Sequence, residues 1–222
     1  MLATPSHNSL FIKKTCGSYG GDNIYKLTLQ DLDNKDLLQK LQSRVVHAGY
    51  LFQETIKQNH QLEELNPSCL NTLRIDTFID DTGAAHIISC YFKTNIKNHY
   101  LDNHPAGGCE ISVDLETGRL KKFGHLTLKF NGLKRLTEHP LTKVVFLDFQ
   151  IPHFQEAKEL VLKAAAYMPS LRLIGWDVAV GEKGPVLVEG NPDYDIAASD
   201  LAYGGYKINP VFQKVLKESK LH

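Results

Sequence analysis

Two carboxylates and one carboxamide lie near the end of the sequence, at Asp177, Glu189 and Asn191. Asp177 belongs to an apolar run, a glycine-containing turn follows, and a second apolar run leads to Glu189 and Asn191. Strand side chains alternate between two faces, so Glu189 and Asn191 are predicted to share a face, and a hairpin would bring Asp177 beside them. Such oxygen donors suit Mg²⁺, with Mn²⁺ as an alternative ion.

The same three residues also have a simpler interpretation. Charged side chains are mostly exposed, and these could face solvent at the ends of two strands. Two carboxylates that converge repel each other unless a cation lies between them, which favours the metal hypothesis for the cluster as a group. The alternative remains that the three residues simply face solvent at the end of the hairpin.

A lysine followed by a glycine-rich segment lies near the other end of the chain. Lys13 closes an apolar run, and a loop with Gly17, Ser18, Gly20 and Gly21 begins shortly after it. Glycine lets backbone N–H groups approach a phosphate closely, and the lysine adds positive charge. A plain turn is the alternative. The sequence contains neither GxxxxGK[ST] nor GxGxxG, so the two common nucleotide-loop patterns are excluded.

The elements that must position these residues divide into two segments. Residues 1–56 are predicted to form a lobe of strands around one helix, with Asp33 or Asn34 as the N-cap and Gly49 at the C-terminal end. Its strands are predicted at residues 9–13, 24–29 and 50–56.

Residues 57–222 are predicted to form a second, larger lobe. It begins with a polar connector, residues 57–67, and contains a helix over residues 154–168 that Pro169 ends. Arg74 and Asp76 are expected on one face of a strand. Its strands are predicted at residues 73–79, 85–93, 111–113, 120–130, 174–180 and 185–188.

Composition excludes several classes of protein. The chain has 222 residues, 42% hydrophobic and 23% charged, which is typical of a globular protein. With 25 basic and 25 acidic residues it lacks the charge excess expected of a nucleic-acid partner. No apolar run is long enough to span a membrane, no secretory signal is apparent, and the four cysteines form no CxxC pair. These features predict a cytoplasmic protein with reduced thiols.

The ordered set of motifs resembles the ATP-grasp superfamily, and within it the sugar-transfer-associated, glutamate-ligase-related branch. The resemblance implies an α+β ATP-grasp fold, with two lobes that enclose a nucleotide cleft. It also implies a preceding domain, which this chain is expected to lack because it starts almost at the glycine-loop lobe. The matching stretches are FIKKTCGSYGGDNI (11–24), YLFQETI (50–56), NPSCLNTLRIDTF (66–78), LDNHPAGG (101–108), EHPLT (138–142), IP (151–152), IGWDVAV (174–180) and GPVLVEGNPDYD (184–195).

The resemblance also implies a role for each matching residue. Lys13 corresponds to the phosphate-contacting lysine, although Lys14 stands where the family usually has proline, so that either lysine could face the cleft. Arg74 would lie over the phosphates, with a surface ion pair to Asp76 or a neighbour as the alternative. Three groups follow in the same way: the triphosphate loop with Gly17, Ser18, Gly20 and Gly21, the adenine contacts Gln53, Glu54 and Ile56, and the metal ligands Asp177, Glu189 and Asn191.

The expected function is a Mg-ATP-dependent carboxylate–amine ligase that works through an acyl phosphate. By analogy with the family, its setting would be surface-polysaccharide or cell-envelope biosynthesis, with a small-molecule or sugar-linked acceptor. Two alternatives stay open. One is a phosphotransferase that acts on a hydroxyl acceptor, and the other is a non-catalytic nucleotide-binding or interaction protein.

Overall fold

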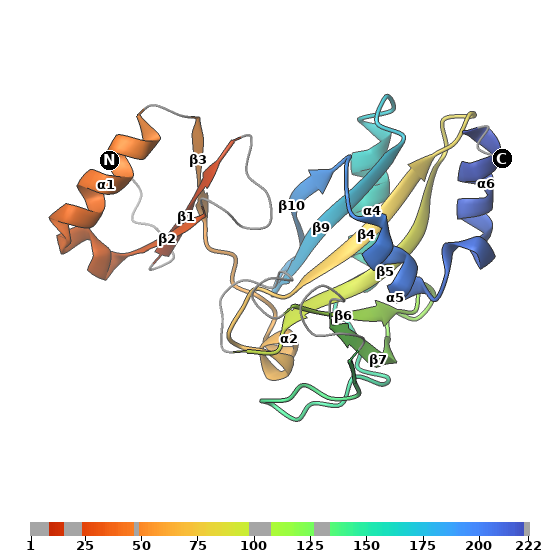
Figure 1. Ribbon diagram of the computed structural model, residues 1–222, viewed down its shortest axis with the longest axis horizontal. Coiled ribbons are helices and arrows are strands. Elements are labelled where there is room, and N and C mark those ends of the chain that lie inside the picture. Colours follow the sequence, from red (N-terminus) through yellow and green to blue (C-terminus); the bar gives the residue numbers. More distant parts are fainter. Residues whose placement is uncertain (1–8, 16–23, 47–48, 98–107, 127–133, 220–222) are drawn as a thin grey trace. The chain divides into compact units, whose positions relative to one another are not determined.

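A computed structural model describes residues 9–15, 24–46, 49–97, 108–126 and 134–219. The chain divides into two compact units, Met1–Lys57 and Gln58–His222. Figure 1 shows the elements of each unit along the chain. None of the helices in the described segments has the length and apolar character required to cross a bilayer.

The smaller unit is an antiparallel sheet with one α-helix. Its strands β1 (Ser9–Lys14), β2 (Tyr25–Thr28) and β3 (Tyr50–Glu54) lie in the order β2-β1-β3. A 3-10 turn, η1 (Leu29–Asp33), leads into α1 (Lys35–Val45).

The N-terminus of α1 follows the sequence prediction, and its C-terminus does not. Asn34 is the N-cap, and its side chain accepts a hydrogen bond from the Leu37 N–H at 3.1 Å. The helix ends at Val45 with Val46 as its C-cap, so the prediction that Gly49 ends it is wrong. The Gly49 carbonyl instead accepts the Thr15 N–H at 2.9 Å.

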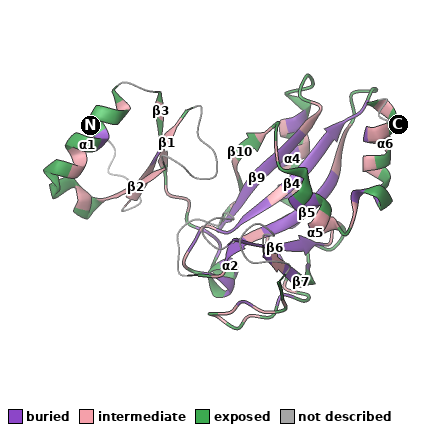
Figure 2. Cartoon of the chain, viewed as in Figure 1, coloured by how far each residue is buried: buried purple, intermediate pink, exposed green. Residues whose placement is uncertain are grey.

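The larger unit is built on one antiparallel sheet, whose strands lie in the order β10-β9-β4-β5-β6-β7-β8. Its central strands β4 and β9 are buried along nearly their whole length (Figure 2). The strands span β4 (Thr72–Ile79), β5 (Ala85–Asn95), β6 (Gly108–Val113), β7 (Leu120–Leu126), β8 (Arg135–Leu136), β9 (Leu173–Gly181) and β10 (Gly184–Asn191).

The helices of this unit are α2 (His60–Leu65), α4 (Phe154–Ala166), α5 (Ile196–Tyr203) and α6 (Pro210–Glu218), with a 3-10 turn η3 (Tyr206–Ile208). The predicted polar connector therefore contains a short helix. Asn59 caps α2, and its apolar residues Leu62 and Leu65 are buried. The predicted strand over residues 120–130 is described only as far as Leu126, and residues 127–133 lie outside the described part of the chain.

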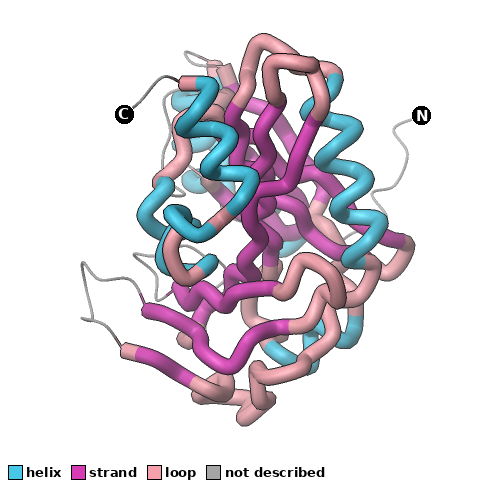
Figure 3. Tube along the Cα trace, turned by 90° about the vertical axis from the view of Figure 1, so that its right-hand side faces the viewer, coloured by secondary structure: helices cyan, strands magenta, loops and turns pink. Residues whose placement is uncertain are grey.

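The two faces of the larger sheet carry different side chains. On one face α4 packs its buried residues Ala157 and Val161 against a core that includes Ile75 and Phe92. The opposite face is polar near β9 and β4, and α5 and η3 cover part of it. There Ala198 of α5 packs on Tyr91, as Ala202 does. The C-terminal helix α6 lies alongside the strands, which Figure 3 shows from a second direction.

Candidate functional site

Strand register brings three of the predicted residues of the larger unit into one row on the polar face, and the fourth, Asn191, lies opposite Gly175 beside that row. Glu189 of β10 lies opposite Asp177 of β9, and Asp177 lies opposite Arg74 of β4. The row continues to Tyr91 of β5 and Ser112 of β6. Directly paired residues of antiparallel strands point to the same face, so these side chains share one surface of the sheet.

Asp177 is the most strongly paired acid of this row. Its Oδ1 accepts a hydrogen bond from Arg74 Nε at 2.6 Å, and its Oδ2 accepts from Arg74 Nη2 at 3.1 Å and from Lys93 Nζ at 3.3 Å. The side chain is almost fully buried, and burial acts to raise its pKa. Lys93 and Arg74 outweigh that effect and lower the pKa of Asp177 to about 2. Asp177 is therefore ionised throughout the physiological range.

Arg74 forms neither the ion pair with Asp76 nor the surface pair that the sequence left open as alternatives. Its partner Asp177 lies 103 positions away in the chain, and both side chains are largely buried. Burial acts to lower the pKa of Arg74, and the charge of Asp177 raises it above the ordinary value. The guanidinium is therefore a permanent positive charge beside the acidic residues.

Glu189 and Asn191 lie together at the end of β10. Asn191 Nδ2 donates to Glu189 Oε1 at 3.2 Å and to the Gly175 carbonyl at 3.4 Å. These two bonds occupy the amide N–H groups and leave the amide oxygen as the donor atom for a cation. Glu189 is exposed, whereas Asp177 is buried.

The donor set fits a hard divalent cation. Within the described residues no group of three His, Cys, Asp or Glu side chains could hold a metal. The cluster instead consists of two carboxylates and an amide oxygen. Mg²⁺ commonly takes one or two protein carboxylates and fills its remaining positions with water and phosphate oxygens. Asp177, Glu189 and Asn191 are therefore the described residues whose oxygen atoms could hold such a cation.

A third acid, Asp76, lies two residues after Arg74 on the same face of β4. Its Oδ2 accepts hydrogen bonds from Ser89 Oγ at 2.8 Å and from the Tyr206 hydroxyl at 2.9 Å. Burial raises the pKa of Asp76. Tyr206 belongs to η3, so this network ties the C-terminal segment to β4 and β5.

The smaller unit carries the remaining predicted residues that the structure describes. Lys13 lies opposite Leu51, and Phe11 lies opposite Gln53, so Lys13 and Gln53 share one face of the sheet. Lys14 and Glu54 are on the other face, which also holds the buried Ile12. Ile56 follows β3 and is half-buried. The loop residues Gly17, Ser18, Gly20 and Gly21 lie outside the described residues.

Lys93 is a component of the site that the sequence analysis did not identify. It closes the apolar run of β5, and only the pairing of β5 with β4 and of β4 with β9 brings it to Asp177. The available signal is its position: a lysine at the end of an apolar strand, two residues after Tyr91. That signal is weak because charged residues end many strands.

The sequence matches the family described as "Sugar-transfer associated ATP-grasp" over residues 4–216. A comparison with curated proteins found no match.

Solved structures share the fold at low sequence identity. The biotin carboxylase domain of 2-oxoglutarate carboxylase from Hydrogenobacter thermophilus, in complex with MgADP, ADP and bicarbonate, is 14% identical with a TM-score of 0.51, over 95% of this chain and 36% of that chain. D-alanyl-alanine synthetase A from Vibrio cholerae O1 biovar eltor is 12% identical with a TM-score of 0.50, over 96% and 52% of the two chains. The ATP-grasp ligase PsnB, complexed with minimal precursor, Mg and ADP, is 16% identical with a TM-score of 0.45, over 96% and 46%.

This chain therefore spans about half or less of the length of the solved structures that it matches. The family match extends over nearly the whole sequence, and the fold is shared with the biotin carboxylase domain and with D-alanyl-alanine synthetase A. The chain belongs to the sugar-transfer associated ATP-grasp family.

Proposed function

We propose that this chain binds Mg-ATP and uses it to activate a carboxylate for capture by an amine. The observation that carries the proposal is the in-register row in which Glu189 and Asp177 lie beside Arg74. Carboxylates for a cation and a fixed guanidinium for phosphate oxygens are then adjacent on one surface. Phosphoryl transfer needs this combination, because its catalysis consists mainly of positioning and charge stabilisation.

Three residues of the larger unit would hold the metal: Asp177, Glu189 and Asn191. When bound, Mg²⁺ neutralises charge on the phosphate oxygens, and Mn²⁺ is an alternative ion. The ion pairs with Arg74 and Lys93 keep Asp177 ionised and correctly oriented before the nucleotide arrives. Arg74 then supplies positive charge to the transferred phosphoryl group.

Roles in the smaller unit are part of the same proposal. Lys13 contacts phosphate; it shares one face of the sheet with Gln53, whereas Lys14 shares the other face with Glu54. Gln53, Glu54 and Ile56 contact adenine. The loop with Gly17, Ser18, Gly20 and Gly21 covers the triphosphate and excludes water.

The proposed chemistry balances without a protein nucleophile. A carboxylate oxygen of the substrate attacks the γ-phosphorus, the bond to the β–γ bridging oxygen breaks, and ADP leaves. The amine then attacks the acyl carbon, inorganic phosphate leaves, and the nitrogen loses a proton to solvent. Exclusion of water is needed because water would otherwise hydrolyse the acyl phosphate.

The biological setting is proposed as surface-polysaccharide or cell-envelope biosynthesis, with a sugar-linked or small-molecule acceptor. The description of the family as associated with sugar transfer supports this setting. A cytoplasmic location is part of the same proposal, because the proposed reaction consumes ATP.

The test measures ATP binding with and without Mg²⁺, followed by ADP release in the presence of candidate carboxylates and amines. We expect Mg²⁺ to strengthen ATP binding, and ADP release to require a carboxylate and to be accompanied by an amide product. A phosphorylated hydroxyl product without an amide would replace the ligase by a kinase. Absence of Mg-dependent ATP binding would contradict the proposal as a whole.

A further inference from the structure

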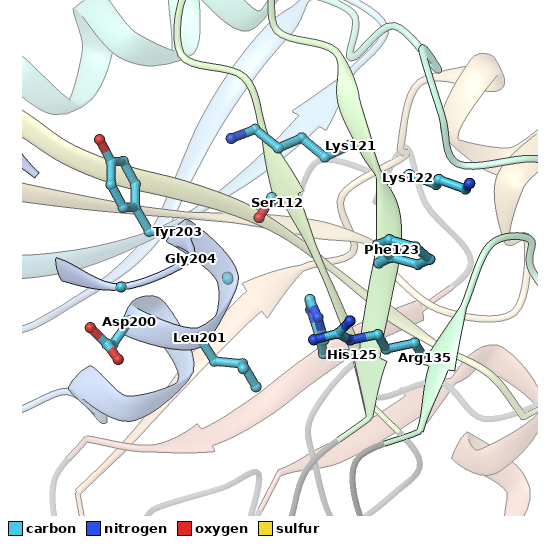
Figure 4. Close-up of a pocket in the computed structure, with 12 residues that line it drawn as sticks. Ser112, Lys121, Lys122, Phe123, His125, Arg135, Asp200, Leu201, Tyr203 and Gly204 are labelled. Atoms are coloured by element: carbon cyan, nitrogen blue, oxygen red, sulfur yellow. The ribbon is translucent and has the colours of Figure 1, made fainter. Parts of the chain in front are cut away.

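A pocket of about 590 Å³ lies on the larger unit, between strand β7 and the end of α5. Its described lining contains the cationic residues Lys121, Lys122 and Arg135 and one carboxylate, Asp200. The chain as a whole has no net charge, so this is a local concentration of positive charge. In Figure 4 Lys121 extends toward Tyr203, whereas Lys122 points the other way.

Two of the three cationic side chains, Arg135 and Lys122, lie against the ring of Phe123. The guanidinium of Arg135 lies 5.5 Å from the centre of the Phe123 ring, and Lys122 Nζ lies 5.4 Å from it. Arg135 is also opposite His125 across the β7–β8 pair. Cation–π contacts of this kind fix the direction of a long side chain and leave its N–H groups available for an anion.

His125 also lines this wall. Its Nδ1 is buried beneath the surface and has no hydrogen-bond partner within the described part of the chain. Burial, with a contribution from Arg135, lowers the pKa of His125, so the ring is neutral at neutral pH and the positive charge of the wall comes from its lysine and arginine side chains.

The opposite wall comes from α5 and is less polar. It presents Leu201 and Tyr203, both half-buried, beside Gly204 and Gly205. The carboxylate of Asp200 is already engaged, since it accepts the Tyr206 N–H at 2.5 Å. One wall thus attracts an anion, and the other offers an aromatic and an aliphatic side chain to the apolar side of a ring.

A polar row connects this pocket to the candidate metal site. Lys93, Glu110, His125 and Arg135 are partners in register across β5, β6, β7 and β8, and Lys93 also contacts Asp177. Three strand spacings separate β5 from β8, or about 14 Å. A ligand that occupied both places would therefore have to be longer than one sugar ring.

We propose that this pocket binds the anionic end of an extended acidic saccharide, whose other end reacts near Asp177. This inference rests on the proposed function and names the class of its acceptor. Lys121 and Arg135 bind a carboxylate or phosphate of the saccharide, and Tyr203 packs on the sugar ring. An acidic peptide would also supply negative charge but has no sugar ring. The test must therefore distinguish an acidic peptide from an acidic saccharide as the ligand.

The experiment titrates the full chain, without nucleotide, with four probes of defined chemistry. They are trigalacturonate, the neutral maltotriose, glucose 1-phosphate and triglutamate. We expect trigalacturonate to bind at least about tenfold more tightly than maltotriose, which lacks carboxylates for Lys121 and Arg135. We expect a similar advantage of about tenfold over triglutamate, which lacks a sugar ring for Tyr203 to pack on. If glucose 1-phosphate also binds, and the same residues are needed, the pocket accepts a sugar phosphate as well as a sugar carboxylate.

The variants Lys121→Gln and Arg135→Gln are each expected to weaken trigalacturonate binding about tenfold. Both side chains are exposed, so the variants should fold, which their thermal midpoints will check. Lys163→Gln removes the same charge from α4, which packs on the other face of the sheet, and should leave binding unchanged.

The proposal is overturned if no acidic saccharide binds, if maltotriose or triglutamate binds as tightly, or if the pocket variants behave like Lys163→Gln. Mg-ATP binding is measured separately, without saccharide. Loss of saccharide binding with intact Mg-ATP binding contradicts the pocket assignment alone. Loss of Mg-dependent ATP binding contradicts the proposed function.

Discussion

The positive charges of Arg74 and Lys93 beside Asp177 make the stability of the fold depend on pH. The pKa of Asp177 is about 2 in the folded chain, against about 3.9 in an unfolded one. A carboxylate whose pKa falls on folding stabilises the fold above its unfolded pKa. That contribution is lost as the pH falls through the folded pKa. The ion pairs of Asp177 should therefore contribute about 2 kcal/mol above about pH 4 and disappear toward about pH 2.

Urea unfolding of the wild type and of Asp177→Asn between pH 7 and pH 2 measures this effect. We expect the wild type to lose about 2 kcal/mol more than the variant between about pH 4 and pH 2. The variant will be less stable at neutral pH, because Arg74 and Lys93 then lose their buried counter-charge. Equal losses in the two proteins would mean that Asp177 is not the group whose pKa is lowered.

Glu189 allows a cleaner test of metal binding than Asp177, because it is exposed and makes few contacts. Glu189→Gln should weaken Mg-dependent ATP binding by about tenfold or more, as loss of a ligand does. Its free energy of unfolding should change by less than about 0.5 kcal/mol. Calorimetric titration with and without Mg²⁺ gives the first quantity, and urea unfolding gives the second.

The control for this variant is Glu159→Gln. Glu159 is an exposed residue of α4, on the far side of the sheet, so the same chemical change is made away from the site. If ATP binding by Glu189→Gln depended on Mg²⁺ as strongly as in the wild type, Glu189 would not be a metal ligand. It would then be an exposed acidic residue near the end of its strand.

The sequence predicts which site residues lie close together within one hairpin. It does not predict which site residues meet across the sheet. Asp177, Glu189 and Asn191 are separated by a single turn, so alternation alone predicts their common face. The Arg74–Asp177 pair joins strands 103 positions apart, and no local pattern reports which distant strands become neighbours. Lys93 was missed for the same reason.

Among the elements, β10 shows why glycine stands between two candidate ligands. A Cβ at Gly190 would lie 2.8 Å from Cζ3 and 3.0 Å from Cε3 of Trp176. Trp176 is buried, and its Nε1 donates to Thr77 Oγ1 at 2.8 Å, so its ring cannot move freely. The indole thus packs directly on the backbone that carries Glu189 and Asn191.

Gly190→Ala should therefore destabilise the chain by about 1–3 kcal/mol through overpacking, and should also weaken Mg-ATP binding by displacing the flanking ligands. Urea unfolding checks the first effect. In a Trp176→Phe background the smaller ring leaves room for the methyl group, so the added cost of Gly190→Ala should fall. An equal cost in both backgrounds would show that the clash with Trp176 is not its cause.

The elements that were predicted well have strong periodicity or clear turn signals. The helix of α4 and the hairpins β4–β5, β6–β7 and β9–β10 belong to this group. Helix α2 was missed because it has six residues and only two buried apolar side chains, Leu62 and Leu65, which is too short for a helical period to be recognised. The end of α1 was misplaced because Gly49 resembles a helix-ending glycine although the helix stops at Val45.

For the molecule as a whole, the two faces of the larger sheet explain how stability and chemistry are separated. One face is closed by α4 around an apolar core. The other carries the charged rows that include Asp177 and Arg74, together with the pocket beside β7. This division could not be read from the sequence, since the order β10-β9-β4-β5-β6-β7-β8 places β4 between two strands from different parts of the chain.

The most direct test of the central claim is a crystal structure of the chain with Mn²⁺ and a non-hydrolysable ATP analogue, in which anomalous scattering locates the metal. We expect a manganese peak in direct contact with oxygen atoms of Asp177, Glu189 and Asn191 and of the analogue's phosphates. A bound analogue whose metal lies away from these three residues would contradict the proposed metal site.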